Sequence, residues 1–387
     1  MRVLSASVLS VSAVSLALMT AGCSSSSPET ASAAVATNGT TRTYFVAAED
    51  VVWDYAPTGS NQMEGRPFQD VEKMFMEAGP TVIGRKAKKA LYFEYTDETF
   101  KTRKPRAPEW EHLGFLGPLI RAQVGDTIRV VFRNNTSFPA SLHPHGVSYK
   151  KDSEGAHYND GTAGPDKADD GVPPGGSHTY VWPVPERAGP TEHEGSSAFW
   201  MYHSHVDEIR DVATGLIGPM VITRRGTALR ADGSPTDVDR ELVAGFIEVD
   251  ENESWYLEEN IKTYATKPKS VKIAPGPFGD LAALPDFGMY FRETINGFTY
   301  GHTPGMTTKV GARTRWYVMS STNFEIHAPH WHGNVVTSNH MRTDVGTLLP
   351  MGMFVADMLP DNPGKWFFHC HVSTHLRAGM QATYLVQ

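Results

Sequence analysis

The chain has 387 residues and a formal charge of −8 at pH 7, from 43 acidic and 35 basic side chains. Its length is sufficient for two or three domains. The sequence has no basic run and no interleaving of aromatic with basic residues, which argues against nucleic acid as a partner. The 35 glycines and 26 prolines, with many segments rich in Val, Thr, Tyr and Phe, predict an all-β fold.

The N-terminal residues 1–22 are predicted to be a secretory leader. Arg2 gives the leader a positive end, and the apolar stretch that follows is too short and too interrupted by serines to span a membrane as a mature helix. The segment Thr-Ala-Gly-Cys23, followed by four serines, resembles a bacterial lipoprotein cleavage site. We therefore expect a cell-surface lipoprotein anchored at Cys23, with secretion after cleavage of a plain signal peptide as the alternative. Residues 23–42 are predicted to be a flexible tether.

Four short motifs along the chain each hold two histidines separated by one residue. They are His143 and His145, His203 and His205, His330 and His332, and His369 and His371. Residues two apart on a strand point to the same face, so each motif presents both imidazoles on one side. A single pair of this kind is more often an ordinary surface or core feature. Four pairs in one chain predict a metal cluster held by eight imidazoles.

A second set of metal ligands surrounds Cys370. This cysteine lies between His369 and His371, so on a strand its side chain points to the opposite face. Two imidazoles, a thiolate and a weak thioether ligand form a blue-copper electron-transfer centre. The predicted ligands are His327, Cys370, His375 and Met380. Because the chain has only two cysteines and Cys370 is needed as a free thiolate, Cys23 requires another explanation than a disulfide, and lipidation provides one.

The two halves of the chain repeat one sequence pattern. Residues 200–205, Trp-Met-Tyr-His-Ser-His, match residues 366–371, Trp-Phe-Phe-His-Cys-His. The histidine motifs at 142–146 and 329–333 also match each other. This repetition predicts an internal duplication of a β-sandwich unit.

Two domains are therefore expected, at residues 43–225 and 236–387, joined by a polar stretch that contains glycine and proline. The position of Cys370 is occupied by Ser204 in the first domain. A serine hydroxyl cannot replace the soft thiolate of a blue-copper site. The first domain is thus predicted to lack that centre.

These motifs resemble those of the multicopper oxidases, over roughly residues 85–387. In that family four such histidine motifs hold a trinuclear copper cluster, and the cysteine of His-Cys-His belongs to a type 1 copper. The resemblance implies cupredoxin folds and about four coppers per chain. It implies His143 and His330 as type 2 ligands, and His145, His203, His205, His332, His369 and His371 as type 3 ligands. The four residues predicted for the blue-copper centre would be the type 1 ligands.

The resemblance also implies an assembly. In two-domain members the cluster forms between the first domain of one chain and the second domain of the next, and this contact closes a homotrimer. The histidine motifs of this chain are divided equally between its two predicted domains. We therefore expect a head-to-tail homotrimer.

A narrower resemblance concerns residues 145–170 and 202–220, which are similar to the first domain of ceruloplasmin and to the clotting-factor A domains. In those proteins the corresponding loop holds a calcium ion. Clustered carboxylates suit Ca²⁺, and a solvated acidic loop is the alternative. The predicted ligands are the Lys151 carbonyl and the carboxylates of Glu154, Asp166, Asp169 and Asp170.

The family resemblance implies an oxidase that takes electrons singly from a reductant and delivers four of them to O₂. His375 is the expected entry point, from which electrons would pass through Cys370 to His369 or His371. Our first hypothesis is a laccase-like oxidase of phenols. The alternative is a ferroxidase, or an oxidase of cuprous or other metal ions. Thr374 stands where ceruloplasmin carries an aspartate that helps to hold iron, which favours the phenol hypothesis.

Two further questions stay open in the sequence. Reduction of O₂ to water needs protons, and Asp207, Glu208 and Asp211 are either donors or a surface charge cluster. A copper-binding relative without turnover, like the clotting factors, is a third hypothesis. The complete set of ligands argues against that hypothesis.

Overall fold

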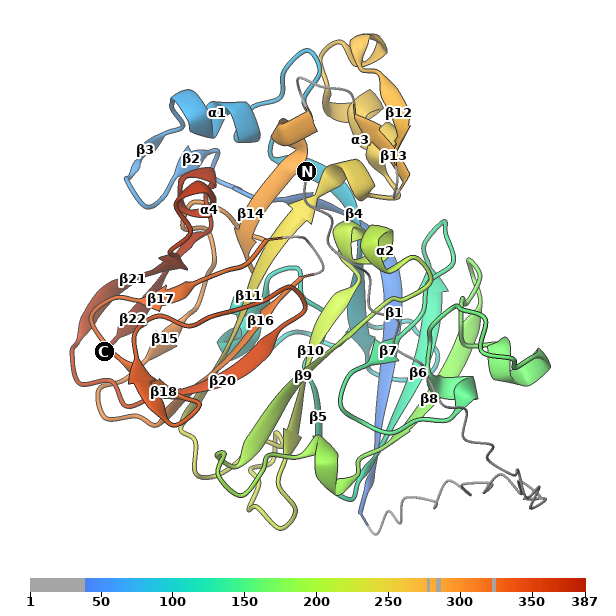
Figure 1. The fold of residues 1–387 in the computed structure, drawn as a ribbon, viewed down its shortest axis with the longest axis vertical. Coiled ribbons are helices and arrows are strands. Elements are labelled where there is room, and N and C mark those ends of the chain that lie inside the picture. Colours follow the sequence, from blue (N-terminus) through green and yellow to red (C-terminus); the bar gives the residue numbers. More distant parts are fainter. Residues whose placement is uncertain (1–38, 277–278, 283–286, 322–324) are drawn as a thin grey trace, which may run out of the picture. The chain divides into compact units, whose positions relative to one another are not determined.

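The first half of the chain folds into two four-stranded sheets that share a hydrophobic core (Figure 1). The computed structural model describes residues 39–276, 279–282, 287–321 and 325–387. One sheet has the order β4 (Lys86–Tyr95), β1 (Thr41–Asp54), β6 (Thr127–Asn135) and β8 (Ser177–Pro183). The other has the order β5 (Ile120–Gln123), β10 (Ile217–Thr223), β9 (Ser197–His203) and β7 (His143–Pro144).

The second half contains a six-stranded and a four-stranded sheet. The larger sheet has the order β14 (Phe291–Ile295), β11 (Arg240–Asp250), β16 (Thr314–Ser320), β20 (Met353–Met358), β18 (Val336–Ser338) and β19 (Met341–Thr343). The smaller has the order β15 (Thr307–Thr308), β22 (Gln381–Val386), β21 (Gly364–Cys370) and β17 (Pro329–Trp331).

The strand order of the first half recurs in the second. Strand β1 runs parallel to β6 and antiparallel to β4, as β11 runs parallel to β16 and antiparallel to β14. In the other sheets, β5 is parallel to β10 as β15 is parallel to β22. The predicted all-β fold built from a repeated sandwich is therefore confirmed.

Alternating side chains explain how these strands form sandwiches. Along β6, Ile128, Val130 and Phe132 are fully buried, while the residues between them are only partly buried. Along β22, Ala382 and Tyr384 are buried in the same alternation. One face of each strand therefore packs into a core, as expected for a period of two.

Another hydrophobic cluster joins the halves. It contains Ile217 and Val221 from β10 together with Val243 and Ile247 from β11. Both strands are buried along nearly their whole length, because they are covered on both faces. The connection between them, residues 224–239, is the polar stretch at which the sequence predicts the domain boundary.

Polar contacts add to this interface between the halves. Arg121 of β5 forms a buried ion pair with Glu241 of β11, with 2.6 Å between Nη2 and Oε2. The Tyr317 hydroxyl donates to the same carboxylate (2.6 Å) and shares a hydrogen bond with Ser197 (2.8 Å). Because removing one partner would leave a buried charge unpaired, this network favours a single docking of the halves.

Short helices and two small hairpins complete the described fold. The helices are α1 (Asp70–Met76), α2 (Glu208–Thr214), α3 (Leu257–Tyr264) and α4 (Ser373–Ala378). The 3₁₀ turns are η1 (Pro108–Leu113), η2 (Lys151–Ser153), η3 (Gly164–Lys167), η4 (Glu186–Ala188), η5 (Glu251–Glu253), η6 (Pro268–Ser270) and η7 (Phe287–Tyr290). The hairpins pair β2 (Ser60–Asn61) with β3 (Arg66–Pro67), and β12 (Ile273–Gly276) with β13 (Gly279–Ala282).

The expected leader and the lipidation residue Cys23 lie outside the described residues, so both stay predictions. The predicted tether extends too far, because Thr41 and Arg42 already belong to β1 and pair with β6. Among the helices that the structure describes, none is long and apolar enough to cross a membrane.

Candidate metal centres

The four predicted histidines of the second half lie together, and we call them the second-half quartet: His330, His332, His369 and His371. Strands β17 and β21 bring them together, because His330 and His369 are directly opposite in the antiparallel pairing. The Nε2 atoms of His332 and His369 are 3.1 Å apart. The ring of His371 lies 5.2 Å from that of His330, centroid to centroid.

The first half holds a matching first-half quartet: His143, His145, His203 and His205. Here β7 and β9 place His143 directly opposite His203. The Nε2 atoms of His145 and His203 are 3.0 Å apart, and the rings of His143 and His205 are 5.1 Å apart. In both halves one histidine of each motif lies in its strand and the other lies just beyond the end of that strand, and the four rings come together.

Backbone carbonyls orient the rings in the same way in both quartets. Nδ1 of His143 is 2.7 Å from the Glu154 carbonyl, and Nδ1 of His330 is 2.8 Å from the Asp344 carbonyl. Each carbonyl can only accept, so Nδ1 carries the proton and Nε2 keeps its lone pair. Hydrogen bonds of this kind fix the tautomer of histidines that bind metals.

The electrostatics of the quartets favour a bound cation. Burial, with neighbouring histidines adding to it, lowers the pKa of His145 to about 4 and that of His369 to about 4. These imidazoles are therefore neutral near pH 7. Neutral imidazoles whose Nε2 atoms lie about 3 Å apart can offer lone pairs to one ion, so the donor set fits a transition metal.

The two quartets are separate within one chain. Among the described residues, no hydrogen bond or ring contact joins a histidine of one quartet to a histidine of the other. His330 and His332 of the second-half quartet are partly exposed, and His371 is exposed. Each quartet therefore supplies half of the eight imidazoles predicted for the cluster.

Three of the four predicted type 1 side chains, those of His327, Cys370 and His375, lie together. The Cys370 sulfur is 3.6 Å from Nδ1 of His375 and 3.9 Å from Nδ1 of His327, and the two Nδ1 atoms are 3.2 Å apart. Met380 is brought to this group because the Cys370 amide donates to its carbonyl (3.1 Å). All four side chains are buried.

The protonation of this group suits a soft metal ion. Burial lowers the pKa of His327 to about 3 and also lowers that of His375, so both imidazoles are neutral donors. Burial raises the pKa of the Cys370 thiol, although the amide of Ala328 approaches the sulfur at 3.4 Å. A metal ion must displace this proton to bind. Thiolate, imidazole and thioether together select copper.

Three carboxylates beside His375 were missed in the sequence. Glu248 of β11 and Glu293 of β14 lie with His375 in one buried group whose oxygen and nitrogen atoms are all within 4.8 Å of one another. Glu325 approaches from the other side, with 3.7 Å between its carboxylate and Nε2 of His375. Figure 1 shows α4, which carries His375, beside β14.

Glu248 and Glu293 are directly opposite each other in the antiparallel pairing of β11 and β14. Burial, increased by the charge of Glu248, raises the pKa of Glu293 well above its usual value. Like charges facing each other across two strands destabilise a sheet. A hydrogen bond between the two side chains adds to the rise in the pKa of Glu293, and the buried group could hold a metal ion.

The calcium site predicted in residues 151–170 is not supported. The Lys151 ammonium pairs with Glu154 and with Asp160, 2.9 Å away. The Lys167 ammonium lies 2.8 Å from Asp160 and 3.0 Å from Asp170. Two ammonium groups thus stand among the carboxylates, which neutralises the charge that a calcium ion would need.

The remaining predicted calcium ligands are also arranged differently. Asp166 is exposed at the surface. Asp169 is buried, and its carboxylate accepts a hydrogen bond from the Gly155 amide (2.7 Å).

The three predicted proton donors occupy different environments. Asp207 is the N-cap of α2 and accepts from the Arg210 amide (3.3 Å). Glu208 lies 3.3 Å from Nε2 of His205, so it contacts the first-half quartet. Asp211 is fully buried away from solvent. Only Glu208 is in contact with a predicted ligand ring among these three.

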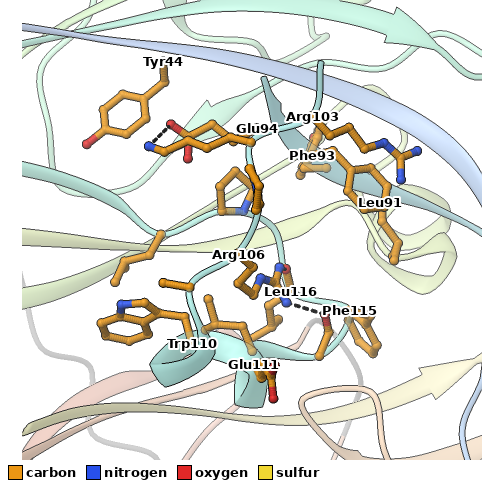
Figure 2. A pocket seen from close by; sticks show the side chains of 18 of the residues that line it. Tyr44, Leu91, Phe93, Glu94, Arg103, Arg106, Trp110, Glu111, Phe115 and Leu116 are labelled. Carbon is orange, nitrogen blue, oxygen red and sulfur yellow. Dashed lines mark hydrogen bonds and ion pairs between the residues drawn. The ribbon is translucent and has the colours of Figure 1, made fainter. Parts of the chain in front are cut away.

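A cavity of about 820 Å³ lies elsewhere, on the first half between β4 and η1 (Figure 2). Some of its charged side chains already have partners. Lys104 pairs with Glu94 (2.9 Å), and Arg106 donates to the carbonyls of Gly114 and Leu116 (2.7 Å each). Since none of the predicted copper ligands is among its described lining residues, the cavity is separate from the metal centres.

Comparison with known proteins gives the family. Two family models, both described as multicopper oxidase, match residues 112–227 and 281–387, together more than half of the chain. Human Ferroxidase HEPHL1 is 43% identical over 349 residues, which are 89% of this chain and 29% of that protein. Human hephaestin is 41% identical over 91% of this chain and 30% of its own length.

Human ceruloplasmin is 39% identical over 89% of this chain and 31% of its own length. The chain thus spans about 30% of the length of these curated relatives. Among solved structures, the multicopper oxidase mgLAC has a TM-score of 0.55 at 19% identity, covering 90% of this chain and 87% of its own.

A blue copper oxidase from Nitrosomonas europaea has a TM-score of 0.52 at 18% identity, covering 89% of this chain and 86% of its own. At this identity the structural matches support the fold alone, and that fold is the cupredoxin-like one expected. From the family models and the fold together, the chain belongs to the multicopper oxidase family.

Proposed function

We propose that this multicopper oxidase takes its electrons from a metal ion, with Fe²⁺ as the favoured substrate. The observation that carries the proposal is the group of carboxylates at His375. Glu248 and Glu293 are buried there, and Glu325 reaches the same imidazole. Fe²⁺ prefers anionic oxygen, so these side chains provide for a metal substrate what a phenol would not need.

The sequence hypothesis ranked phenols first because Thr374 is neutral. That ranking is revised. The acidic groups come from β11, β14 and the segment before His327 rather than from the neighbour of His375. The curated relatives named as ferroxidase also favour the metal-ion alternative.

The chain's own residues define how electrons would travel. Bound copper would supply one-electron acceptor chemistry at the buried type 1 group and oxygen chemistry at the quartets. Glu248 and Glu293 hold the substrate ion beside His375, which provides the contact with the type 1 group. The Cys370 backbone leads directly to His369 and His371 of the second-half quartet. Oxidation of four Fe²⁺ supplies four electrons, which with four protons reduce one O₂ to two waters.

The quartets suggest how the oxygen site is completed. We propose that the first-half quartet of one chain meets the second-half quartet of another, in a homotrimer. Apolar side chains near the second-half quartet support a covered face, since Val335 is 49% exposed and Val345, which bridges to His330, is 36% exposed. Each chain would then carry about four coppers, because Ser204 leaves the first half without a type 1 site.

Oxygen uptake decides between the substrates. The copper-loaded protein is given Fe²⁺, Cu⁺ and a methoxyphenol in parallel, with copper-depleted protein as the control. We expect the specificity constant for Fe²⁺ to exceed that for the phenol. A larger constant for the phenol would restore the laccase-like hypothesis, and a larger constant for Cu⁺ would reassign the carboxylate group.

A further inference from the structure

The first half preserves the backbone of a type 1 site although it lacks the ligands. In the second half, the Cys370 amide donates to the Met380 carbonyl (3.1 Å), and the Met380 amide donates to the His375 carbonyl (3.0 Å). In the first half, the Ser204 amide donates to the Leu216 carbonyl (3.1 Å), and the Leu216 amide donates to the Asp211 carbonyl (3.0 Å). The equivalent positions are therefore Ser204 for Cys370, Asp211 for His375 and Leu216 for Met380.

Asp211 uses this position to hold the segment that carries two quartet histidines. Its Oδ2 accepts from the Ser204 hydroxyl (2.6 Å) and from the amides of Val206 (3.0 Å) and Asp207 (3.2 Å). The side chain is fully buried. One carboxylate oxygen thus fixes the backbone on both sides of His205.

We call the hydrogen bonds that Asp211 accepts from residues 204–207 the Asp211 bracket. Ser141 extends this bracket to the other strand of the quartet. Its amide donates to the Ser204 hydroxyl oxygen (3.0 Å), and its own hydroxyl accepts from the His205 amide (2.9 Å). Ser141 lies two residues before His143. The hydrogen bonds around Asp211 therefore connect both strands that present the first-half quartet.

Trp255 links the bracket to the second half of the chain. Its indole Nε1–H donates to Oδ1 of Asp211 (2.8 Å). The ring stacks on Phe138 of the first half at 5.1 Å with an angle of 15°, and the Arg210 guanidinium lies 4.0 Å from its centre. Both oxygens of Asp211 are thus used, one within the first half and one across the interface.

We propose that Asp211 is a positioning residue for the copper cluster, occupying the abandoned type 1 position and coupling the first-half quartet to the second half through Trp255. The inference rests on the proposed function in that the quartet binds copper. Hydrogen bonds to the outer side of metal ligands typically change metal affinity by roughly 10- to 100-fold. Asp211 acts through the backbone of residues 204–207 rather than through the imidazoles themselves.

Asp211→Asn tests the bracket, because an amide nitrogen would face one of the donors that the carboxylate accepts. In the copper-free protein we expect faster hydrogen exchange of the Val206 and Asp207 amides. In the loaded protein we expect cluster copper to bind about 10-fold more weakly, with a reduced EPR signal. The blue absorption from Cys370 should be unchanged, and kcat should fall for Fe²⁺ while KM stays the same.

Trp255→Phe provides the second variant. It keeps a ring on Phe138 and removes only the N–H donor, so a smaller change of the same kind is expected even if Asp211→Asn fails to fold. Glu259→Gln, an exposed carboxylate that pairs with Lys88, is the matched control. If Asp211→Asn folds, wild-type exchange rates and wild-type cluster affinity in that variant would overturn the inference. If it does not fold, the same result in Trp255→Phe would overturn it. A wild-type protein that takes up no cluster copper would instead refute the proposed function. Hydrogen exchange in the copper-free protein would still show whether Asp211 holds the backbone of residues 204–207.

Discussion

Glu293→Gln is the sharpest perturbation of the carboxylate group beside His375. The substitution keeps the shape of the side chain and one oxygen acceptor, and it removes the ability to become a carboxylate when a cation binds. Glu248, which lies directly opposite on β11, is unchanged. The type 1 residues are untouched, so copper binding and colour serve as internal controls.

The expected size of the effect follows from the spacing of the group. Its ligand atoms lie within 4.8 Å of one another, so a bound divalent ion would be no farther than that from the Glu293 oxygen. At this separation the gross attraction is about 7 kcal/mol with an effective dielectric constant of ~20. Desolvation of a buried carboxylate costs several kcal/mol and offsets most of this. A net loss of about 1.4 to 2.8 kcal/mol corresponds to a rise of about 10- to 100-fold in the KM for Fe²⁺.

The assay compares Fe²⁺ with a methoxyphenol in the same preparations. We expect the KM for Fe²⁺ to rise and the kinetics of the phenol to stay within about twofold of the wild type. Glu259→Gln, on the surface, is the control for loss of one carboxylate. An unchanged KM for Fe²⁺ at full copper content would show that the substrate ion does not bind at Glu293.

The pH dependence supplies an independent check with a defined sign. Because burial and Glu248 raise the pKa of Glu293, this group holds a proton at pH values where an ordinary glutamate is ionised. Protons therefore compete with Fe²⁺ for the site. The KM for Fe²⁺ should rise as the pH falls, beginning at a higher pH than for an exposed carboxylate, and Glu293→Gln should weaken this dependence.

Three further predictions concern the copper sites. Cys370→Ser is expected to abolish the intense visible absorption while about three coppers per chain remain in metal analysis, and a blue variant would contradict the type 1 assignment. His203→Ala and His369→Ala are each expected to be inactive, and to regain activity when unfolded and reassembled together, because some contacts in mixed trimers join two intact quartets. A fully active, strictly monomeric wild type in light scattering would refute that result. Gly379→Ala is expected to weaken the blue colour, since Gly379 has a φ of 111° and an added Cβ would lie 2.8 Å from the Tyr300 ring. The matched change Gly215→Ala, at a φ of 120° in the first half, should leave the blue colour unchanged.

The quartets and the type 1 group could be predicted because their members are close in sequence. In His369-Cys370-His371, the alternation of a strand alone separates the thiol from the two imidazoles. The repeat of this motif in the first half also predicted the duplicated sandwich. Local spacing was enough in these cases because β17 with β21, and β7 with β9, are short antiparallel pairs that carry their histidines directly opposite each other.

The carboxylate group could not be predicted in the same way. Glu248 and Glu293 are far apart in sequence and meet only through the register of β11 with β14. The calcium prediction is unsupported for a related reason, since Lys167 and Asp160 carry no signal of their pairing until the loop is folded. Composition within a loop does not say which acidic groups already have a cationic partner.

The register of β11 and β14 is itself an argument about function. A slip of one residue would place Glu248 opposite Arg292 or Thr294 instead of Glu293. Opposite charges across two strands stabilise a sheet, whereas like charges directly opposite destabilise it. The observed register therefore places two buried carboxyl groups opposite each other beside His375, where the raised pKa of Glu293 and a hydrogen bond between the two side chains lessen their repulsion. A bound cation reverses the sign of this interaction, because it is attracted by both carboxylates. A metal substrate that displaces the proton of Glu293 is then held by both carboxylates, so the observed register is the one expected of a site for Fe²⁺.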